Sequence, residues 1–262
     1  MQEIRLYEYD TIDSTNRLLL DMARDGEPCG SAVWAHRQSG GRGRLGRSFC
    51  SPEGGIYVSV LVPLNASGSS AITLTAMAGV AVRRTIKQVC GRDCGIKWVN
   101  DIIYKGKKVC GILAQACGDK AVIGIGINYR SDISQFPSEL QETAISLYKP
   151  EEEAPSEGLF VRTLVCAVYS LCTRADENWL SEYKSSSTIV GNKVQIMQAG
   201  EVTGEGLAVS IDDSCALHVT DSLGKEIVLS TGEVSIRIRK EEKNDKQGRV
   251  ERTGSDQTSD DV

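Results

Sequence analysis

The stretch Gln38-Ser-Gly-Gly-Arg-Gly-Arg-Leu-Gly-Arg47 determines how the rest of this chain is interpreted. It combines four glycines with three arginines within ten residues. Glycine lets the backbone adopt positive φ and approach a ligand closely, while arginine offers a planar fork of donors that suits phosphate and carboxylate. We interpret the stretch as an anion-binding loop that becomes ordered around its ligand.

Two other interpretations of this loop are disfavoured by its surroundings. The segment Gly41-Arg-Gly-Arg-Leu-Gly46 fits the letters of the dinucleotide motif G-x-G-x-x-G, which needs a preceding strand and a helix opening at the glycines. Residues 31–36 can form the strand, but residues 47–55 are rich in loop-forming residues. The pair Gly-Arg-Gly-Arg also resembles arms that enter the DNA minor groove. A formal net charge of -5 and the lack of a larger basic patch argue against DNA as a partner.

Composition indicates a globular protein with one large and one small domain. The chain has 262 residues, of which 40% are hydrophobic and 25% charged. No apolar run approaches the roughly 20 residues that span a bilayer, and the start lacks the features of a signal peptide, so we expect no membrane partner. Nine scattered cysteines predict buried or partly buried thiols in a cytoplasmic protein. Cys90 and Cys94 form a close pair, but the two histidines are far away in sequence, which disfavours zinc.

The first residues predict a strand followed by a helix. Residues 4–9 alternate apolar and charged side chains, as in an edge or half-buried strand. The cluster Asp13-Ser-Thr-Asn16 then precedes apolar positions at helical spacing, and Gly26 ends the run. Ser14 or Thr15 is therefore expected to cap a helix. The free amides and hydroxyls at this helix end are also suited to hold a polar group of a ligand.

The remaining segments alternate between strand and helix patterns before becoming all strand. We expect strands at 31–37, 56–62 and 121–128, a helix at 71–89, and a hairpin over 96–113 that turns at Lys105-Gly-Lys107. Residues 132–155 form a polar connector with short helical pieces, and 156–183 a single amphipathic helix. Five short strands at 193–197, 204–209, 216–220, 226–229 and 234–237 predict a small barrel. Residues 240–262 are nearly all polar and predict a disordered tail.

Five motifs together resemble biotin protein ligase over most of residues 1–240. They are Asp13-Ser-Thr-Asn16, Gln38 with Gly41-Arg-Gly-Arg-Leu-Gly-Arg47, Lys97-Trp-Val-Asn-Asp101, Lys108-Val-Cys-Gly111 and Gly124-Ile-Gly-Ile-Asn128. The resemblance implies an α/β (α+β) catalytic domain with a mixed central sheet over 1–185, followed by an SH3-like β-barrel over 188–239. It also implies a short form that lacks an N-terminal DNA-binding domain, because the chain starts directly at the catalytic domain.

The activity implied by the resemblance is ATP-dependent. Such a ligase joins biotin to ATP as biotinyl-5′-AMP and passes biotin to a lysine of the biotin carboxyl carrier protein of acetyl-CoA carboxylase or a related carboxylase. ATP and Mg²⁺ are the implied cofactors, and biotin is the substrate. A homodimer is also implied as possible, because relatives pair edge to edge through the central sheet.

The resemblance assigns roles to residues by their place in the motifs. Lys108 and Arg44 are the expected catalytic residues, and Asp101 is expected to hold Mg²⁺ through the nucleotide. The expected biotin-binding residues are Ser14, Thr15, Asn16, Gln38, Arg42, Gly43, Arg44, Lys108, Gly111, Gly124 and Ile125, with Trp98 as a further wall. The expected adenylate-binding residues are Arg42, Arg44, Arg47, Phe49, Asn100, Asp101, Lys108 and Asn128.

Two positions depart from the pattern of this family, and two other functions compete with it. Val99 stands where proline is usual, and Phe49 where tryptophan often packs near the adenylate. The nearest alternative is a lipoate or octanoate ligase or transferase, of which a transferase would need a placed cysteine nucleophile. The other is a DNA-binding regulator that uses this fold to sense biotin, which the acidic charge balance disfavours.

Overall fold

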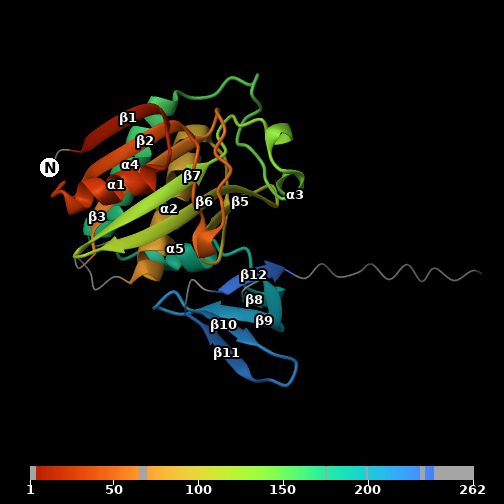
Figure 1. Ribbon diagram of the computed structural model, residues 1–262. Coiled ribbons are helices and arrows are strands. Elements are labelled where there is room, and N and C mark those ends of the chain that lie inside the picture. Colours follow the sequence, from red (N-terminus) through yellow and green to blue (C-terminus); the bar gives the residue numbers. More distant parts are fainter. Residues whose placement is uncertain (1–3, 65–69, 175, 199, 231–233, 239–262) are drawn as a thin grey trace, which may run out of the picture.

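The computed structural model describes residues 4–64, 70–174, 176–198, 200–230 and 234–238, and within them the chain forms two sheets (Figure 1). The larger sheet has seven strands in the order β1-β2-β3-β7-β6-β5-β4. Its strands are β1 Arg5–Ile12, β2 Ser31–Gln38, β3 Ile56–Pro63, β4 Gly95–Lys97, β5 Asp101–Tyr104, β6 Lys107–Cys117 and β7 Lys120–Ile127. Only β1 and β2 pair in parallel. The mixed central sheet of an α/β domain is therefore confirmed.

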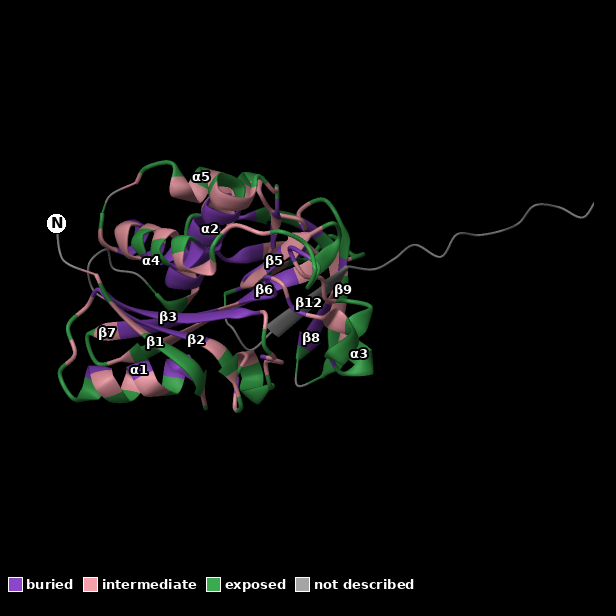
Figure 2. Ribbon diagram, turned by 90° about the horizontal axis from the view of Figure 1, so that it is seen from above, coloured by how far each residue is buried: buried purple, intermediate pink, exposed green. Residues whose placement is uncertain are grey.

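Helices cover both faces of this sheet (Figure 2). Helix α1, Thr15–Arg24, packs Leu19 and Ala23 against one face. On the other face lie the helices α2 Ala71–Cys90, α4 Glu157–Thr173 and α5 Trp179–Ser185. Strand β3 is buried along nearly its whole length, because it sits between the two helical layers. This explains its mostly apolar sequence.

Local sequence signals predicted the helix start and the hairpin turn correctly. The Ser14 side chain accepts a hydrogen bond from the Arg17 backbone amide and caps α1. Between β5 and β6, Lys105 has φ 48° and Gly106 has φ 76°. Positive φ at both central residues is the backbone of a tight two-residue turn. The connector after β7 also contains the expected short helical pieces, η2 Ile133–Gln135 and α3 Ser138–Gln141.

The prediction of one helix over 156–183 was wrong. Helix α4 ends at Thr173 and α5 begins at Trp179. Between them, a carboxylate oxygen of Asp176 accepts a hydrogen bond from the Asn178 backbone amide, a local bond that competes with helix continuation. Leu159, expected on the apolar stripe, is 57% exposed.

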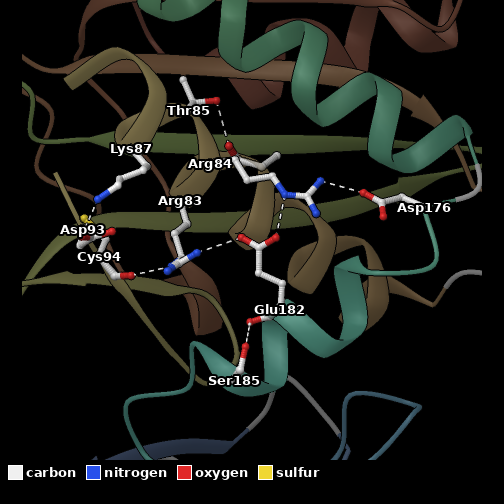
Figure 3. Close-up of polar contacts among 10 residues, drawn as sticks. Arg83, Arg84, Thr85, Lys87, Asp93, Cys94, Asp176, Glu182 and Ser185 are labelled. Carbon is white, nitrogen blue, oxygen red and sulfur yellow. Dashed lines mark hydrogen bonds and ion pairs between the residues drawn. The ribbon is translucent and has the colours of Figure 1, made fainter. Parts of the chain in front are cut away.

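Ion pairs hold α5 and the segment before it against α2 (Figure 3). Glu182 accepts hydrogen bonds from the guanidinium groups of Arg83 at 2.9 Å and Arg84 at 2.8 Å. Arg84 also donates to Asp176 at 2.7 Å, and Arg83 donates to the carbonyl of Cys94 at 2.8 Å. These contacts connect α5 and Asp176 to α2 and, through Arg83, to Cys94, the residue that precedes β4.

The smaller sheet has five strands in the order β11-β10-β9-β8-β12, and all neighbours pair antiparallel. Its strands are β8 Lys193–Gln198, β9 Glu201–Ile211, β10 Leu217–Thr220, β11 Glu226–Leu229 and β12 Val234–Ile238. All five predicted strands are thus confirmed. The predicted tail at 240–262 lies outside the described residues.

Two further sequence expectations concern cysteines and the membrane. The nine cysteines are free thiols, and Cys166 is exposed, although buried or partly buried thiols were expected. Within the described ranges, no helix is both long enough and apolar enough to cross a bilayer.

Candidate active site

A cavity of about 270 Å³ lies where α1, the glycine-arginine loop, β6, β7 and the connector meet. Apart from Trp98, it brings together the residues to which the sequence motifs assigned a role in binding or catalysis. Those residues are Ser14, Thr15, Asn16, Gln38, Arg42, Gly43, Arg44, Arg47, Phe49, Asn100, Asp101, Lys108, Gly111, Gly124, Ile125 and Asn128. Segments more than 100 residues apart in sequence therefore line one space.

One part of the cavity lining, which we call its polar end, is polar and uncharged. Ser14, Thr15 and Asn16 are buried at the start of α1. The side-chain oxygen of Gln38 accepts hydrogen bonds from the Thr15 backbone amide at 2.8 Å and from the Thr15 hydroxyl at 3.1 Å. Ser59 of β3, which is fully buried, donates to the Asn16 side-chain oxygen at 2.6 Å. These bonds fix the orientation of groups that can donate to and accept from a neutral ligand.

The glycine-arginine loop folds back on itself at the cavity rim. The Phe49 amide donates to the Gly41 carbonyl at 2.9 Å, and the Gly43 amide donates to the Arg47 carbonyl at 2.7 Å. A Cβ at Gly41 would lie 2.5 Å from the Phe49 carbonyl oxygen, so a side chain there would clash with backbone. Glycine is thus required at position 41 for the loop to fold back. In this conformation Arg42, Arg44 and Arg47 line the cavity.

A second part of the cavity lining, which we call its centre, carries the cations Arg44 and Lys108. An Nη atom of Arg44 donates to the Asn100 side-chain oxygen at 2.5 Å, and Lys108 Nζ lies 2.7 Å from a carboxylate oxygen of Asp101. Burial lowers the pKa of Arg44, and the nearby Asp101 carboxylate opposes that shift. The two cations are therefore oriented by an amide and a carboxylate from one short turn, Asn100-Asp101.

Phe49 lies against two glycines of the central sheet. A Cβ at Gly126 would be 2.4 Å from the Phe49 ring, and a Cβ at Gly111 would be 2.9 Å from it. Lys108 Nζ lies 5.8 Å from the ring centroid, which allows a cation–π contact. The ring at this position therefore packs directly beside the lysine, and it needs both glycines to do so.

Gly124 of the glycine-rich strand β7 and Asn128, which directly follows that strand, both contribute to the cavity wall. A Cβ at Gly124 would lie 1.9 Å from the Asn16 side-chain oxygen, so this glycine admits Asn16 to the cavity wall. Asn128 is buried, and its side-chain amide nitrogen donates to the Ile145 carbonyl at 3.1 Å. Its side-chain oxygen has no hydrogen-bond partner among the described residues. This oxygen can accept a hydrogen bond from a ligand.

Sequence reasoning missed the contribution of the connector. Phe136, Leu140, Thr143 and Ala144 also line the cavity, as part of a segment interpreted only as polar. The Lys108 amide donates to the Thr143 carbonyl at 2.8 Å, and the Ile145 amide donates to the Lys108 carbonyl at 2.9 Å. The one available signal was the apolar pair Phe136 and Leu140 at a spacing of four within a polar stretch.

The expectation that Trp98 forms a wall of the binding site was wrong. Trp98 is only 4% exposed and is absent from the cavity lining. Its indole nitrogen donates instead to the Cys215 carbonyl at 2.9 Å, in the turn between β9 and β10. The side chain points away from the cavity because its N–H has a partner in the smaller sheet.

Asp101 is the single carboxylate among the described residues that line the cavity. The described part of the chain contains no group of three or more histidine, cysteine and acidic side chains that could hold a metal ion. This donor set fits a Mg²⁺ ion that is carried by nucleotide phosphates, because such an ion keeps several waters and needs only one or two carboxylates.

Comparisons with known proteins identify the family of this chain. Residues 9–129 match the Biotin/lipoate A/B protein ligase family. The chain is 34% identical over 168 residues to the Bifunctional ligase/repressor BirA of Bacillus subtilis, an alignment that covers 62% of this chain and 52% of that protein. It therefore spans about half the length of this relative.

Two other relatives match over most of their length. The chain is 30% identical over 234 residues to the Biotin--[acetyl-CoA-carboxylase] ligase of Mycobacterium tuberculosis, covering 84% of this chain and 85% of that protein. The structure of the biotin protein ligase from Aquifex aeolicus in complex with biotin and ATP superposes with a TM-score of 0.78 and 25% identity, covering 90% of this chain and 99% of that chain. The chain therefore belongs to the Biotin/lipoate A/B protein ligase family.

Proposed function

We propose that this protein is a biotin protein ligase, which activates biotin with ATP as biotinyl-5′-AMP and transfers biotin to a lysine of a biotin carboxyl carrier domain. The observation that carries this proposal is the composition of the cavity. A polar, uncharged end built on Thr15 and Gln38 adjoins a cationic centre built on Arg44 and Lys108. Biotin has the same two parts, a neutral ureido ring and a carboxylate.

The first half-reaction joins two anions. A carboxylate oxygen of biotin attacks the α-phosphorus of ATP, the new P–O bond forms, and the bond to the β-phosphate breaks to release pyrophosphate. The protein must neutralise charge and align the reactants. Lys108 is suited to bridge the carboxylate and the α-phosphate, since its ammonium group lies at the cavity centre with rotatable donors. No nucleophilic side chain is needed.

In the second half-reaction, the amine of the carrier lysine attacks the acyl carbon of the mixed anhydride. An amide bond forms, the bond to the phosphate oxygen breaks, AMP leaves, and the amine loses a proton. Until then the anhydride must be kept from water. The loop with Arg42, Arg44 and Arg47 is suited to hold its phosphate, because the loop lies at the cavity rim and presents charged donors.

We assign the polar end to the ureido ring of biotin. Ser14, Thr15, Asn16 and Gln38 supply hydroxyl and amide groups that match its donors and acceptors, and the backbone of Gly43, Arg44 and Gly111 adds further groups. Gly124 and Ile125 form the wall beside the ring. Arg42, Arg44 and Lys108 face the carboxylate.

We assign the remaining lining to ATP. Arg47, Asn100, Asp101 and Asn128 supply polar contacts, and Phe49 offers an aromatic face. Mg²⁺ would be held by Asp101 together with the phosphates, and when bound it would neutralise phosphate charge. Phe136 and Leu140 extend the apolar surface at this end of the cavity.

We also propose the domain organisation and assembly that accompany this function. The catalytic domain comprises 1–185, an SH3-like barrel 188–239, and a polar tail 240–262. Among the described residues, strand β1 is an open sheet edge of eight residues, whereas at the other edge Ile96 of β4 is bridged to Ser187. An open edge supports pairing of two copies through β1. Sedimentation analysis with and without biotin and ATP tests for this homodimer.

A cysteine-dependent acyl transferase is less well supported by the site. Cys50 and Cys110 line the cavity, and burial raises the pKa of both thiols. A thiol with a raised pKa is a poor nucleophile at neutral pH. The site thus lacks an activated thiol among the described residues that line it.

Carrier modification in the presence of competing acids tests the proposal. Purified protein, ATP, Mg²⁺ and biotin are incubated with a biotin carboxyl carrier domain and with its variant in which the target lysine is replaced by arginine. We expect mass spectrometry to find one biotinyl group on the first carrier only, in the presence of excess lipoate. Lipoylation of the carrier, or no modification, would contradict the proposal.

A further inference from the structure

Trp98 belongs to the motif Lys97-Trp-Val-Asn-Asp101, yet it takes no part in the mechanism above. Its side chain is buried, and its indole N–H donates to the Cys215 carbonyl at 2.9 Å across 117 residues of sequence. Cys215 lies in the turn between β9 and β10 of the smaller sheet. A residue of the active-site motif is therefore bonded directly to the second structural unit.

The turn that accepts this bond is itself rigidly built. A carboxylate oxygen of Asp212 accepts hydrogen bonds from the backbone amides of Ser214 at 2.8 Å and Ala216 at 2.9 Å. The Cys215 amide donates to the Asp212 carbonyl, and Cys215 has φ 65°, in the left-handed region. Asp212 therefore fixes the direction in which the Cys215 carbonyl points.

The residues after Trp98 carry the polar groups of the cavity centre. The Asn100 side-chain oxygen accepts from Arg44, its nitrogen donates to the Ile112 carbonyl at 3.2 Å, and Asp101 pairs with Lys108. Tyr183 of α5, which is buried, donates to the Val99 carbonyl at 3.4 Å. The turn is thus held at Trp98 and Val99 from outside the cavity and presents Asn100 and Asp101 inside it.

We propose that Trp98 is a positioning residue through which the smaller sheet fixes Asn100 and Asp101, and with them the nucleotide side of the active site. The inference rests on the proposed function, because it assigns Asn100 and Asp101 to ATP. The biotin end is held by other elements, since Thr15 is fixed by Gln38 of β2 and Asn16 by Ser59 of β3. Loss of the Trp98 bond should therefore affect ATP more than biotin, which depends on this turn only through Arg44 and Lys108.

Two variants remove the same bond from opposite sides. Trp98→Phe keeps an aromatic ring in the core but has no N–H to donate. Asp212→Ala leaves Trp98 in place and releases the turn that presents the Cys215 carbonyl, and it also removes one carboxylate partner of His218. Asp221→Ala is the matched control, because Asp221 accepts from the Leu223 and Lys225 amides in the turn between β10 and β11 and so builds the same kind of turn away from Trp98.

The measurement is the KM for ATP and the KM for biotin in pyrophosphate exchange, with ATP affinity determined separately by calorimetry. We expect Trp98→Phe and Asp212→Ala each to raise the KM for ATP about fivefold, the effect of one lost hydrogen bond, with a smaller rise in the KM for biotin. The double variant should be no worse than either single variant, because both remove one interaction. Asp221→Ala should behave as wild type.

Failure of this inference differs from failure of the proposed function. Equal loss for ATP and biotin, or single variants that match wild type, would overturn the role of Trp98. Additive effects in the double variant, about 25-fold in total, would also overturn it, because the two residues would then act separately. A wild-type protein without biotin-dependent exchange would contradict the proposed function, and the calorimetric ATP affinities would still decide the inference.

Discussion

At the scale of single residues, the two cations of the cavity centre already have polar partners. Lys108 pairs with Asp101 at 2.7 Å, and Arg44 donates to Asn100 at 2.5 Å. A phosphate or carboxylate that enters this space competes with Asp101 for the lysine ammonium. Such pairing keeps the cations oriented before substrate arrives, and this preorganisation lowers the cost of stabilising charge during the reaction.

Lys108→Ala should abolish adenylate formation and leave the fold intact. The substitution removes the cation that bridges the two anionic reactants, while the β6 backbone bonds to the connector are kept. Pyrophosphate exchange measures the loss, and far-ultraviolet circular dichroism checks the fold. Lys107→Ala is the control, because Lys107 is the neighbouring exposed lysine on β6. Normal exchange by the Lys108 variant would remove this residue from the mechanism.

Arg44→Ala should weaken retention of the adenylate more than binding of biotin. The variant loses one charge-assisted hydrogen bond to the phosphate, which contributes roughly 1.5–3 kcal/mol. Release of labelled biotinyl-5′-AMP and equilibrium binding of biotin give the two free energies. Arg37→Ala, an exposed arginine on β2 before the loop, serves as control. Equal losses for biotin and adenylate would show that the loop is not specialised for the intermediate.

At the scale of structural elements, ion pairs and a strand bridge hold α5 and the segment after it against α2 and β4. Glu182 binds both Arg83 and Arg84 of α2 (Figure 3), and the segment that follows α5 pairs with Ile96 of β4. The side chains in this cluster are partly exposed, so water screens their charges. The cluster sets the position of α5 more than it adds to stability.

Glu182→Gln should lower the free energy of unfolding by about 1 kcal/mol, because two arginines lose a charged partner that is only partly buried. Urea denaturation measures the change. Asp93→Asn is the matched control, since it removes an exposed pair with Lys87 of the same helix, α2. A Glu182 variant as stable as wild type would mean that the pairs contribute nothing to holding α5.

His218 of β10 lies between two carboxylates, one on β11 and one in the turn after β9. Hydrogen bonds to Glu226 at 2.7 Å and to Asp212 at 3.1 Å raise the pKa of His218 above its ordinary value of about 6.5. A raised pKa in the folded state means that protonated His218 stabilises the fold. That contribution is complete below the ordinary pKa and is lost as pH rises through the raised pKa.

We therefore expect His218→Gln to destabilise the protein at about pH 6 and to have a smaller effect at about pH 9. The difference in Tm between wild type and variant at the two pH values measures this dependence. His36→Gln gives a comparison with a histidine of the larger sheet. A difference that does not change with pH would show that the His218 charge is unimportant.

At the scale of the whole molecule, periodicity and turn chemistry predicted most of the architecture, and the errors arise where an individual side-chain contact overrides periodicity. The hairpin turn at Lys105 and Gly106 and the five strands of the smaller sheet follow from local preferences. The break between α4 and α5 depends on a single local bond at Asp176, which helical periodicity does not reveal.

The candidate site was predicted by motif and not by periodicity. Its assigned residues gather at one cavity, whereas Phe136 and Leu140 were missed because they lie in an irregular connector. Trp98 was placed wrongly because its partner, Cys215, lies in the other sheet. A motif identifies which residues are close to a site, but only tertiary packing determines which way each side chain points.

The central claim is that one cavity joins a neutral, polar binding end to a cationic centre that activates a carboxylate. The most direct test is exchange of labelled pyrophosphate into ATP by the purified protein with Mg²⁺. We predict exchange that requires biotin and is not supported by lipoate. Exchange with another acid but not with biotin would overturn the substrate, and the absence of exchange with any acid would contradict adenylate formation itself.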